Sequence, residues 1–227
     1  MHVPHAALAR ALVATVAALV LQAPAPAQAV HYVDATGNGA FVDVQSAVDA
    51  AADGDVVLVR SGTYPGFAVD GRSLSVVADA GADVRIAGTI TVRNTPAGGF
   101  VLVADLASEG AVAQVVSRPG LEVLDNAGHV RVQGCAAKGG QGWPDLFNGG
   151  DGGPGAVVTN SLRAAFVRCT LTGGIGYGTA LFGVHGGDGG AGLVEQGSAL
   201  ALYDCAMKGG AGGDADYNYA GHTAGDG

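Results

Sequence analysis

Basic residues are scarce in this sequence of 227 residues. It contains 11 lysines and arginines, only two of them lysines, against 20 aspartates and glutamates, so the formal net charge is −9. Nucleic acids and anionic membranes both bind proteins through a basic face. The charge therefore argues against both as partners, whereas it is compatible with divalent cations.

Long hydrophobic runs are also scarce, and the one at residues 11–23 lies near the N-terminus. It follows a weakly basic start that ends at Arg10, and it precedes the small-x-small sequence Ala27-Gln28-Ala29. This order is typical of a secretory signal peptide, and the run is too short to cross a bilayer. We expect residues 1–29 to be removed, which leaves a chain from Val30 with 10 basic and 20 acidic residues and a charge of −10. That mature chain should have no membrane span and should be secreted, periplasmic or at the cell surface.

Glycine, in contrast, is abundant at 40 of 227 residues. Three segments follow the pattern Cys-x-x-x-Gly-Gly-x-Gly and begin at Cys135, Cys169 and Cys205, spaced 34 and 36 residues apart. A second glycine cluster follows each of them. A repeat of this length is typical of a solenoid, in which each unit packs on its neighbours.

Apolar residues alternate on both sides of each cysteine, which predicts two short strands joined at a corner. The apolar residues before the cysteines are Val130 and Val132, Ala164 and Phe166, and Leu200 and Leu202. Those after them are Ala137, Leu171 and Met207, and the corners fall at Gln133-Gly134, Val167-Arg168 and Tyr203-Asp204. The pattern predicts coils of short strands stacked in parallel over residues 130–227.

The N-terminal half carries strand-like runs without room for crossover helices. They are 56–59, 67–69, 74–77, 84–86, 90–92, 100–103, 111–116 and 121–123. Ahead of them, Asp43 is placed to cap a helix whose apolar face contains Val44, Ala47, Val48 and Ala51. We therefore expect a strand and a capping helix over residues 30–54, and regular coils over 55–129.

The block from Tyr32 to Val77, YVDATGNGAFVDVQSAVDAAADGDVVLVRSGTYPGFAVDGRSLSVV, resembles the opening of the pectin lyase-like superfamily. The resemblance implies an all-β fold, a single-stranded right-handed parallel β-helix of about six coils with a capping helix. Glycine-rich loops would enlarge its last three coils. The superfamily includes lyases, esterases, glycosidases and binding proteins, so the resemblance does not select an activity.

The three cysteines are expected to occupy one inward column, with a structural role. Parallel side chains on adjacent strands hold the β-carbons farther apart than a relaxed disulfide needs. We expect a ladder of buried thiols at Cys135, Cys169 and Cys205. The alternative is one strained disulfide with one free thiol.

The glycine clusters do not fit a nucleotide-binding loop, because neither a following helix nor a Gly-Lys-Ser/Thr ending is present. The nearest match to a calcium-binding nonapeptide is GGAGGDADY from Gly209, which places Asp216 where a large apolar residue is needed. We expect glycine-rich loops that leave the coil between strands, in which tight turns and close backbone stacking require torsions that other residues resist.

Aromatic and acidic residues recur in these loops. The rings are Trp143, Phe147, Tyr177, Phe182, Tyr217 and Tyr219, and the carboxylates are Asp151, Asp188, Asp214, Asp216 and Asp226. One interpretation is small cores beneath the loops. Another is a ladder that binds sugar faces or Ca²⁺, and a third is a protein-binding surface.

The catalytic strings of pectin esterases, polygalacturonases and pectate lyases are not found in the chain. Arg118, Arg131 and Lys138 are the candidates for a proton-abstracting residue, and each also fits an ordinary solvated position. We therefore expect a non-catalytic binding or structural protein that binds a polysaccharide or another cell-envelope component. A polysaccharide lyase or glycoside hydrolase is the alternative, and purely structural packing in a matrix is a third.

The last repeat stops at Asp226-Gly227 within its second glycine cluster. An uncapped coil would expose unpaired backbone groups and apolar side chains. This pattern predicts either a longer protein or association through the open end.

Overall fold

The computed structural model describes residues 28–112, 117–143, 149–178 and 186–213. The expected signal peptide lies outside these residues except for Gln28 and Ala29. Within the described parts of the chain, none of the helices is both long and apolar enough to cross a membrane.

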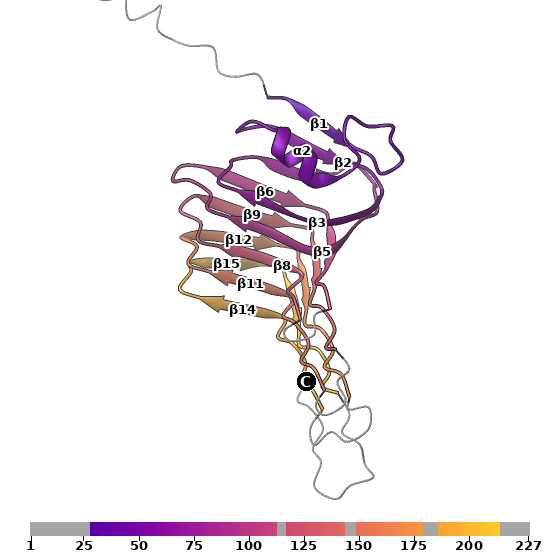
Figure 1. The fold of residues 1–227 in the computed structure, drawn as a ribbon. Coiled ribbons are helices and arrows are strands. Elements are labelled where there is room, and N and C mark those ends of the chain that lie inside the picture. The colour runs from indigo at the N-terminus through magenta and orange to yellow at the C-terminus, as the bar shows by residue number, and fades with distance from the viewer. Residues whose placement is uncertain (1–27, 113–116, 144–148, 179–185, 214–227) are drawn as a thin grey trace, which may run out of the picture.

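The chain is all-β apart from one short helix, and its strands stack in parallel (Figure 1). Sheet A contains seven strands in this order: β1 (Val30–Val33), β2 (Val56–Val59), β4 (Ser75–Ala78), β6 (Phe100–Ala104), β9 (His129–Gln133), β12 (Arg163–Val167) and β15 (Leu200–Tyr203). Each strand in this order belongs to a later turn of the chain than the strand before it. The predicted parallel coil is therefore confirmed.

The second sheet divides into two branches at its long strands, β3 (Gly62–Asp70) and β5 (Val84–Arg93). The first half of β5 leads to the first branch: β7 (Ala107–Glu109), β10 (Ala136–Lys138), β13 (Thr170–Thr172) and β16 (Ala206–Lys208). The second half leads to the second branch: β8 (Leu121–Leu124), β11 (Ala156–Thr159) and β14 (Leu193–Gln196). Each turn of the coil therefore passes through sheet A, the first branch and the second branch.

Glycines allow β3 and β5 to bend together where the branches separate. The register shifts between Pro65 and Phe67 on β3 and between Ala87 and Gly88 on β5. A β-carbon on Gly66 would lie 2.7 Å from the carbonyl oxygen of Thr89. In later turns, the glycine-rich segments leave the coil at this same place in the turn.

A single left-handed residue forms each of the other two corners. Between sheet A and the first branch these residues are Asp105, Gly134, Arg168 and Asp204, and between the second branch and sheet A they are Asn94, Asp125, Asn160 and Gly197. All have φ between 48° and 66°. The corners predicted at Gly134, Arg168 and Asp204 are confirmed, whereas the second set was not recognised from the sequence.

Two details of the strand prediction need correction. A strand was expected over residues 111–116, but Ala111 and Val112 belong to no strand, and residues 113–116 lie outside the described residues. The chain instead forms β7 at Ala107–Glu109, which was not predicted. This three-residue strand is too short to show a clear alternation.

The inward columns form one hydrophobic core. Val132 and Phe166 are fully buried, as the alternation predicted. Leu202 occupies the same column in the last turn but is 38% exposed, because β15 is the last of the described strands in sheet A and no further strand covers it.

A ladder of polar side chains accompanies the second corner. Buried Asn126 accepts a hydrogen bond from the Thr95 amide at 2.9 Å and donates to the carbonyls of Val92 and Leu124. Ser161 and Ser198 continue the ladder in the next two turns. These side chains thus hydrogen-bond with backbone groups of the corner, where the strands end.

The three cysteines stand in one inward column as free thiols. Cys135 and Cys169 are buried, and their thiols donate to carbonyl oxygens, including that of Val103 for Cys135 and that of Val132 for Cys169. Burial raises the pKa of Cys135 to about 12 and also raises that of Cys169. Cys205, in the last turn, is half-buried.

Helix α2 (Val44–Ala50) begins where the sequence predicted, because Asp43 accepts a hydrogen bond from the Ser46 amide at 2.8 Å. Its apolar face packs against β1, β2 and β3. The side-chain amide of Gln45 also pairs with both backbone groups of Ala68 on β3, at 2.8 and 3.2 Å. A side chain thus supplies the hydrogen bonds that a further strand would make there.

Asp55 fixes the N-terminal strand to the coil. Its buried carboxylate accepts hydrogen bonds from His31 and from the backbone amides of Ala29 and Ala52, each at 2.8 to 2.9 Å. These bonds lower the pKa of Asp55 from 3.8 to about 2, and the hydrogen bond from His31 makes the largest contribution.

Acid should weaken this end of the protein. Because the pKa of Asp55 is lower in the folded chain than in the unfolded chain, its contribution to stability is present above about pH 4 and is lost as the pH falls towards 2. Urea unfolding at pH 7, 4 and 2.5 should show a smaller pH dependence for Asp55→Asn than for the wild type. Asp204→Asn, at an exposed corner, is the control, and an equal pH dependence in wild type and Asp55→Asn would contradict the assignment.

Thiol labelling should distinguish the cysteines. In the native protein a thiol reagent at pH 8 should modify Cys205 first, while Cys135 and Cys169 react slowly because they are buried and protonated. After unfolding without reductant, all three should react. A count of one reactive thiol in the unfolded protein would show a disulfide instead of a free ladder.

Candidate functional site

The glycine-rich segments form a narrow extension of the coil, which we call the glycine stalk: residues 139–143, 149–155, 173–178, 186–192 and 209–213 (Figure 1). Segments that leave the coil alternate with segments that return. None of the described stalk glycines has a positive φ. The backbone there is extended and does not consist of the tight turns that the sequence suggested.

Backbone hydrogen bonds join the stalk segments in one series. Gly140 donates to Arg118, Gly153 to Gly140, Gly174 to Gly153, Gly190 to Gly174 and Gly210 to Gly190, all at 2.7 to 2.8 Å. Because each segment is hydrogen-bonded to the next, the segments hold fixed positions relative to one another in the stalk.

The stalk needs glycine because its segments touch backbone to backbone. A β-carbon on Gly174 would overlap the carbonyl oxygen of Gly140, and one on Gly210 would overlap that of Gly174. Gln141, Asp151 and Ile175 are exposed between buried or half-buried glycines. The close backbone stacking that the sequence predicts is therefore confirmed for the described stalk glycines, whereas none of them has the positive φ of a glycine turn.

Two of the predicted ring residues lie on this stalk and are accessible to solvent. Trp143 is 41% exposed and Tyr177 is 37% exposed. Gly150 donates to the carbonyl of Trp143 at 3.0 Å, and Tyr177 donates to the carbonyl of Gly150 at 2.9 Å. The rings thus belong to successive outgoing segments, and both are accessible to solvent. Phe147, Phe182, Tyr217 and Tyr219 lie outside the described residues.

A groove of about 430 Å³ crosses the outer face of β5, β7, β10 and β13. We call it the polar groove after its charged and hydroxyl-bearing side chains, although most of its exposed lining is apolar. Lys138 pairs with Glu109 at 2.7 Å, and Arg85 pairs with Asp83 at 3.1 Å. Hydroxyl groups come from Thr63, Thr170 and Thr172, while the small Ala107 and Ala136 leave the centre open. Such a lining offers both donors and acceptors to a neutral polar ligand.

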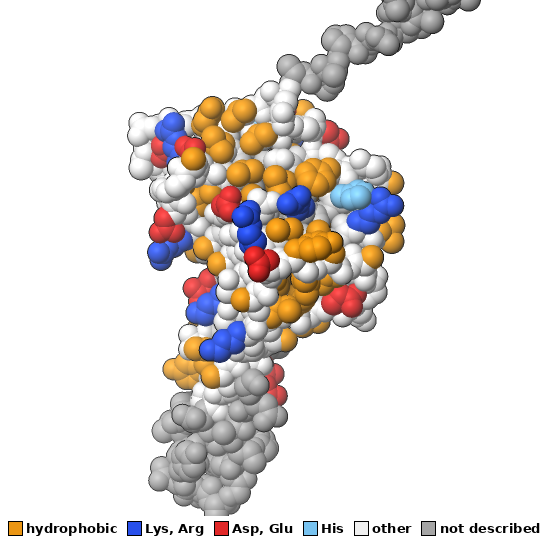
Figure 2. Space-filling view, turned by 180° about the vertical axis from the view of Figure 1, so that it is seen from behind, with side chains coloured by type: hydrophobic (Ala, Val, Ile, Leu, Met, Phe, Trp, Pro, Cys, Tyr) orange, Lys and Arg blue, Asp and Glu red, His pale blue; other side chains and the backbone are white. Residues whose placement is uncertain are grey.

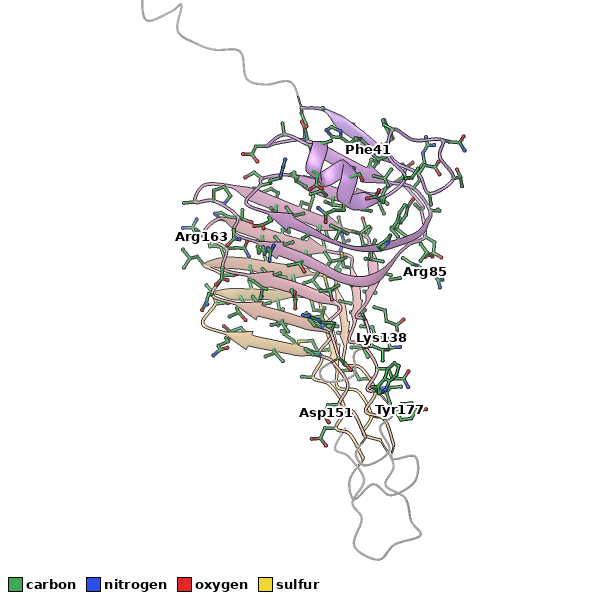
Figure 3. All side chains as sticks on the ribbon, in the orientation of Figure 1. Phe41, Arg85, Lys138, Asp151, Arg163 and Tyr177 are labelled. Atoms are coloured by element: carbon green, nitrogen blue, oxygen red, sulfur yellow. The ribbon has the colours of Figure 1, made fainter. Side chains whose placement is uncertain are left out.

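The groove and the exposed ring of Tyr177 lie on the same side of the molecule. Lys138 ends β10 and directly precedes the first stalk segment, and Figure 3 shows it above Tyr177 on one flank. Asp151 projects from the opposite flank of the stalk in the same view. The site therefore combines hydrogen-bonding groups on the coil with aromatic faces on the stalk.

A second groove, of about 510 Å³, lies on the outer face of sheet A. Its charged or titratable lining residues are His129, Arg131 and Arg163, beside the exposed ring of Phe100. His129 and Arg163 are 2.7 Å apart at Nε2 and Nη1. Figure 2 shows that the back of the molecule carries many hydrophobic side chains among basic and acidic ones.

The three suspected catalytic residues do not converge. Lys138 lies in the polar groove, whereas Arg131 lies on sheet A. Arg118 precedes β8, and its carbonyl accepts the first bond of the stalk series. A single proton-transfer site that uses all three is therefore not formed.

Two of the five candidate calcium ligands, Asp151 and Asp188, lie on the described part of the stalk. Asp151 is exposed and accepts a hydrogen bond from the Asp188 amide at 2.8 Å. Ca²⁺ requires six to eight oxygen ligands. Within the described ranges there is no group of three or more metal-binding side chains, and Asp214, Asp216 and Asp226 lie outside them.

Sequence reasoning missed most of the polar groove. Arg85, Glu109 and Thr172 come from separate turns, and only the strand register places them together. The repeat itself gave a signal for Lys138 and Thr172, which both directly precede a Gly-Gly pair.

No protein-family model and no curated protein matches the sequence. Among solved structures, the chain is similar to the crystal structure of the pectate lyase Pel9A, with 16% identity and a TM-score of 0.37. The match covers 88% of this chain and 58% of that one, so this chain spans little more than half of its length. A likeness this low says nothing of ligand or catalysis, and the fold rests on the strand pairing described above.

Replacing a buried stalk glycine should destabilise the stalk. Gly174→Ala places a methyl group against the Gly140 carbonyl, and we expect a cost of about 1–3 kcal/mol in the free energy of unfolding, as for other overpacked sites. Ile175→Ala, at the next and exposed position, should change it by less than about 0.5 kcal/mol. Denaturant unfolding measures both, and equal effects would show that the segments are not packed as described.

Proposed function

We propose that the protein is an exported, non-catalytic scaffold that binds a polysaccharide of its surroundings or of the cell envelope. The observation that carries the proposal is the position of two exposed rings, Trp143 and Tyr177, on an ordered stalk beside the polar groove. Sugars present hydroxyl groups at their edges and C–H groups on their faces. The groove suits the edges, and the rings suit the faces.

The arrangement also supports an extended ligand. Successive turns of the coil repeat at about 4.8 Å, the spacing of hydrogen-bonded strands. The groove crosses β5, β7, β10 and β13, and Trp143 and Tyr177 lie five residues beyond the ends of β10 and β13 on the outgoing stalk segments. A chain of sugar units fits such a surface better than a compact small molecule does.

No specific observation on the described residues favours catalysis. Lys138, the one suspected base in the groove, is engaged by Glu109, while Arg118 and Arg131 lie elsewhere. A polysaccharide lyase or glycoside hydrolase therefore remains the alternative and is a second outcome of the binding experiment.

We also infer that the coil is right-handed and that α2 closes its first turn. Right-handed crossovers prevail among parallel strands. The pairing of Gln45 with Ala68 and the buried face of α2 support the closing role.

A polysaccharide panel tests the proposal. Neutral and acidic polysaccharides are immobilised, and retention of the wild type is compared with Trp143→Ala, Tyr177→Ala and Lys138→Ala. Loss of a stacked ring, at about 0.5–1.5 kcal/mol, should weaken binding roughly twofold to tenfold. Phe100→Ala is the matched control, because that ring is 46% exposed but lies on sheet A.

Equal retention of the wild type and both ring variants would contradict this site. Absence of retention on every polysaccharide would contradict the proposed function. Release of unsaturated products or reducing ends during incubation would instead establish an enzyme.

A further inference from the structure

Sheet A carries basic side chains without acidic ones. Its seven strands, β1, β2, β4, β6, β9, β12 and β15, contain two arginines and two histidines but no aspartate or glutamate. The composition does not predict this, because acidic residues outnumber lysines and arginines by 20 to 11 in the whole chain. Sheet A therefore differs in charge from the protein as a whole.

The strand register brings three of these basic groups together. His129 on β9 lies beside Phe100 on β6 and beside Arg163 on β12. Arg131 lies two residues after His129 on the same face of the strand and is paired with Ala165 on β12. All five residues line the groove of about 510 Å³, which we call the sheet A groove. Three basic side chains thus occupy adjacent positions around one hollow.

The basic groups of the sheet A groove have no carboxylate partner within the described part of the chain. Arg163 lies 2.7 Å from the ring nitrogen of His129, and Arg131 forms no ion pair and no side-chain hydrogen bond with a described residue. None of the lining residues is an aspartate or glutamate. In the polar groove, in contrast, Lys138 and Arg85 each face a carboxylate. An anion that enters the sheet A groove would not have to displace an existing ion pair.

The rest of the lining is apolar. Phe100 is 46% exposed and Leu162 is 63% exposed, while Ala165 and Ala201 contribute only methyl groups to the face. The volume of about 510 Å³ is in the range of sites that bind small organic ligands. Guanidinium groups bind carboxylates through paired hydrogen bonds, and aromatic rings favour contact with other rings. This lining suits a molecule that joins a carboxylate to a ring.

We propose that the sheet A groove is a second binding site, which takes a small aromatic carboxylate. Arg131 and Arg163 bind the carboxylate, and Phe100 and Leu162 contact the ring. Figure 3 shows Arg163 and Lys138 on opposite sides of the molecule. The inference does not depend on glycan binding, because the sheet A groove and the polar groove share no lining residue.

Titration of the full chain with phenylacetate, followed by calorimetry or by NMR of the ligand, tests the proposal. Saturable binding is expected. Phenylacetamide keeps the ring but has no charge, and acetate keeps the charge but has no ring. Each should bind about fivefold or more weakly than phenylacetate, because each loses one of the two kinds of contact. High salt should also weaken the binding of phenylacetate, since the site is open to solvent.

Three variants locate the site. Arg131→Gln should weaken the binding of phenylacetate by about fivefold or more, and Phe100→Ala should weaken it by roughly twofold to tenfold. Arg168→Gln is the matched control and should bind as the wild type does, because Arg168 is exposed directly after β12 but does not line the groove. Absence of binding, equal affinity for phenylacetate and phenylacetamide, or equal losses in Arg131→Gln and Arg168→Gln would each overturn the proposal.

Discussion

Each turn of this protein has to lie directly on the turn before it, at the distance of hydrogen-bonded parallel strands. This constraint explains why residues of one kind recur in columns. A left-handed residue that turns the chain at one level must be matched by a left-handed residue at the next, as Asp105, Gly134, Arg168 and Asp204 show. Inward thiols and polar side chains are stacked for the same reason, because each rung rests on a rung of similar size.

The same constraint becomes stricter in the glycine stalk. In the coil, side chains fill the space between the three faces, but in the stalk the backbones themselves are in contact. Gly140, Gly153, Gly174 and Gly190 leave no room for a β-carbon on their inner sides. Ordering a glycine on folding costs more conformational entropy than ordering any other residue. Stacking on the ordered coil and the hydrogen bonds between segments offset that cost, and this support allows Trp143 and Tyr177 to be held apart from the core.

Parts of this architecture could be predicted because they repeat or alternate. The pattern around Cys135, Cys169 and Cys205 marked both strands and the corner between them, and Asp43 marked the start of α2. The equivalent stretch at Asp105-Leu106 has neither cysteine nor a Gly-Gly pair, so β7 was missed. The polar groove could not be predicted from the sequence, for a different reason. Lys138 and Glu109 are 29 residues apart, and only the register of β10 on β7 brings them within 2.7 Å.

The last described turn is not equivalent to those above it. Glu195 occupies the inward column that holds Val123 and Val158 in earlier turns, and its carboxylate accepts from the Ser198 amide at 2.6 Å, where a further rung of the polar ladder would accept. An inward charge on an end strand opposes pairing with another strand. Leu202 and Met207 in the same turn are apolar and exposed. The carboxylate of Glu195 therefore protects the edge of β14, whereas the inward residues of β15 and β16 are apolar.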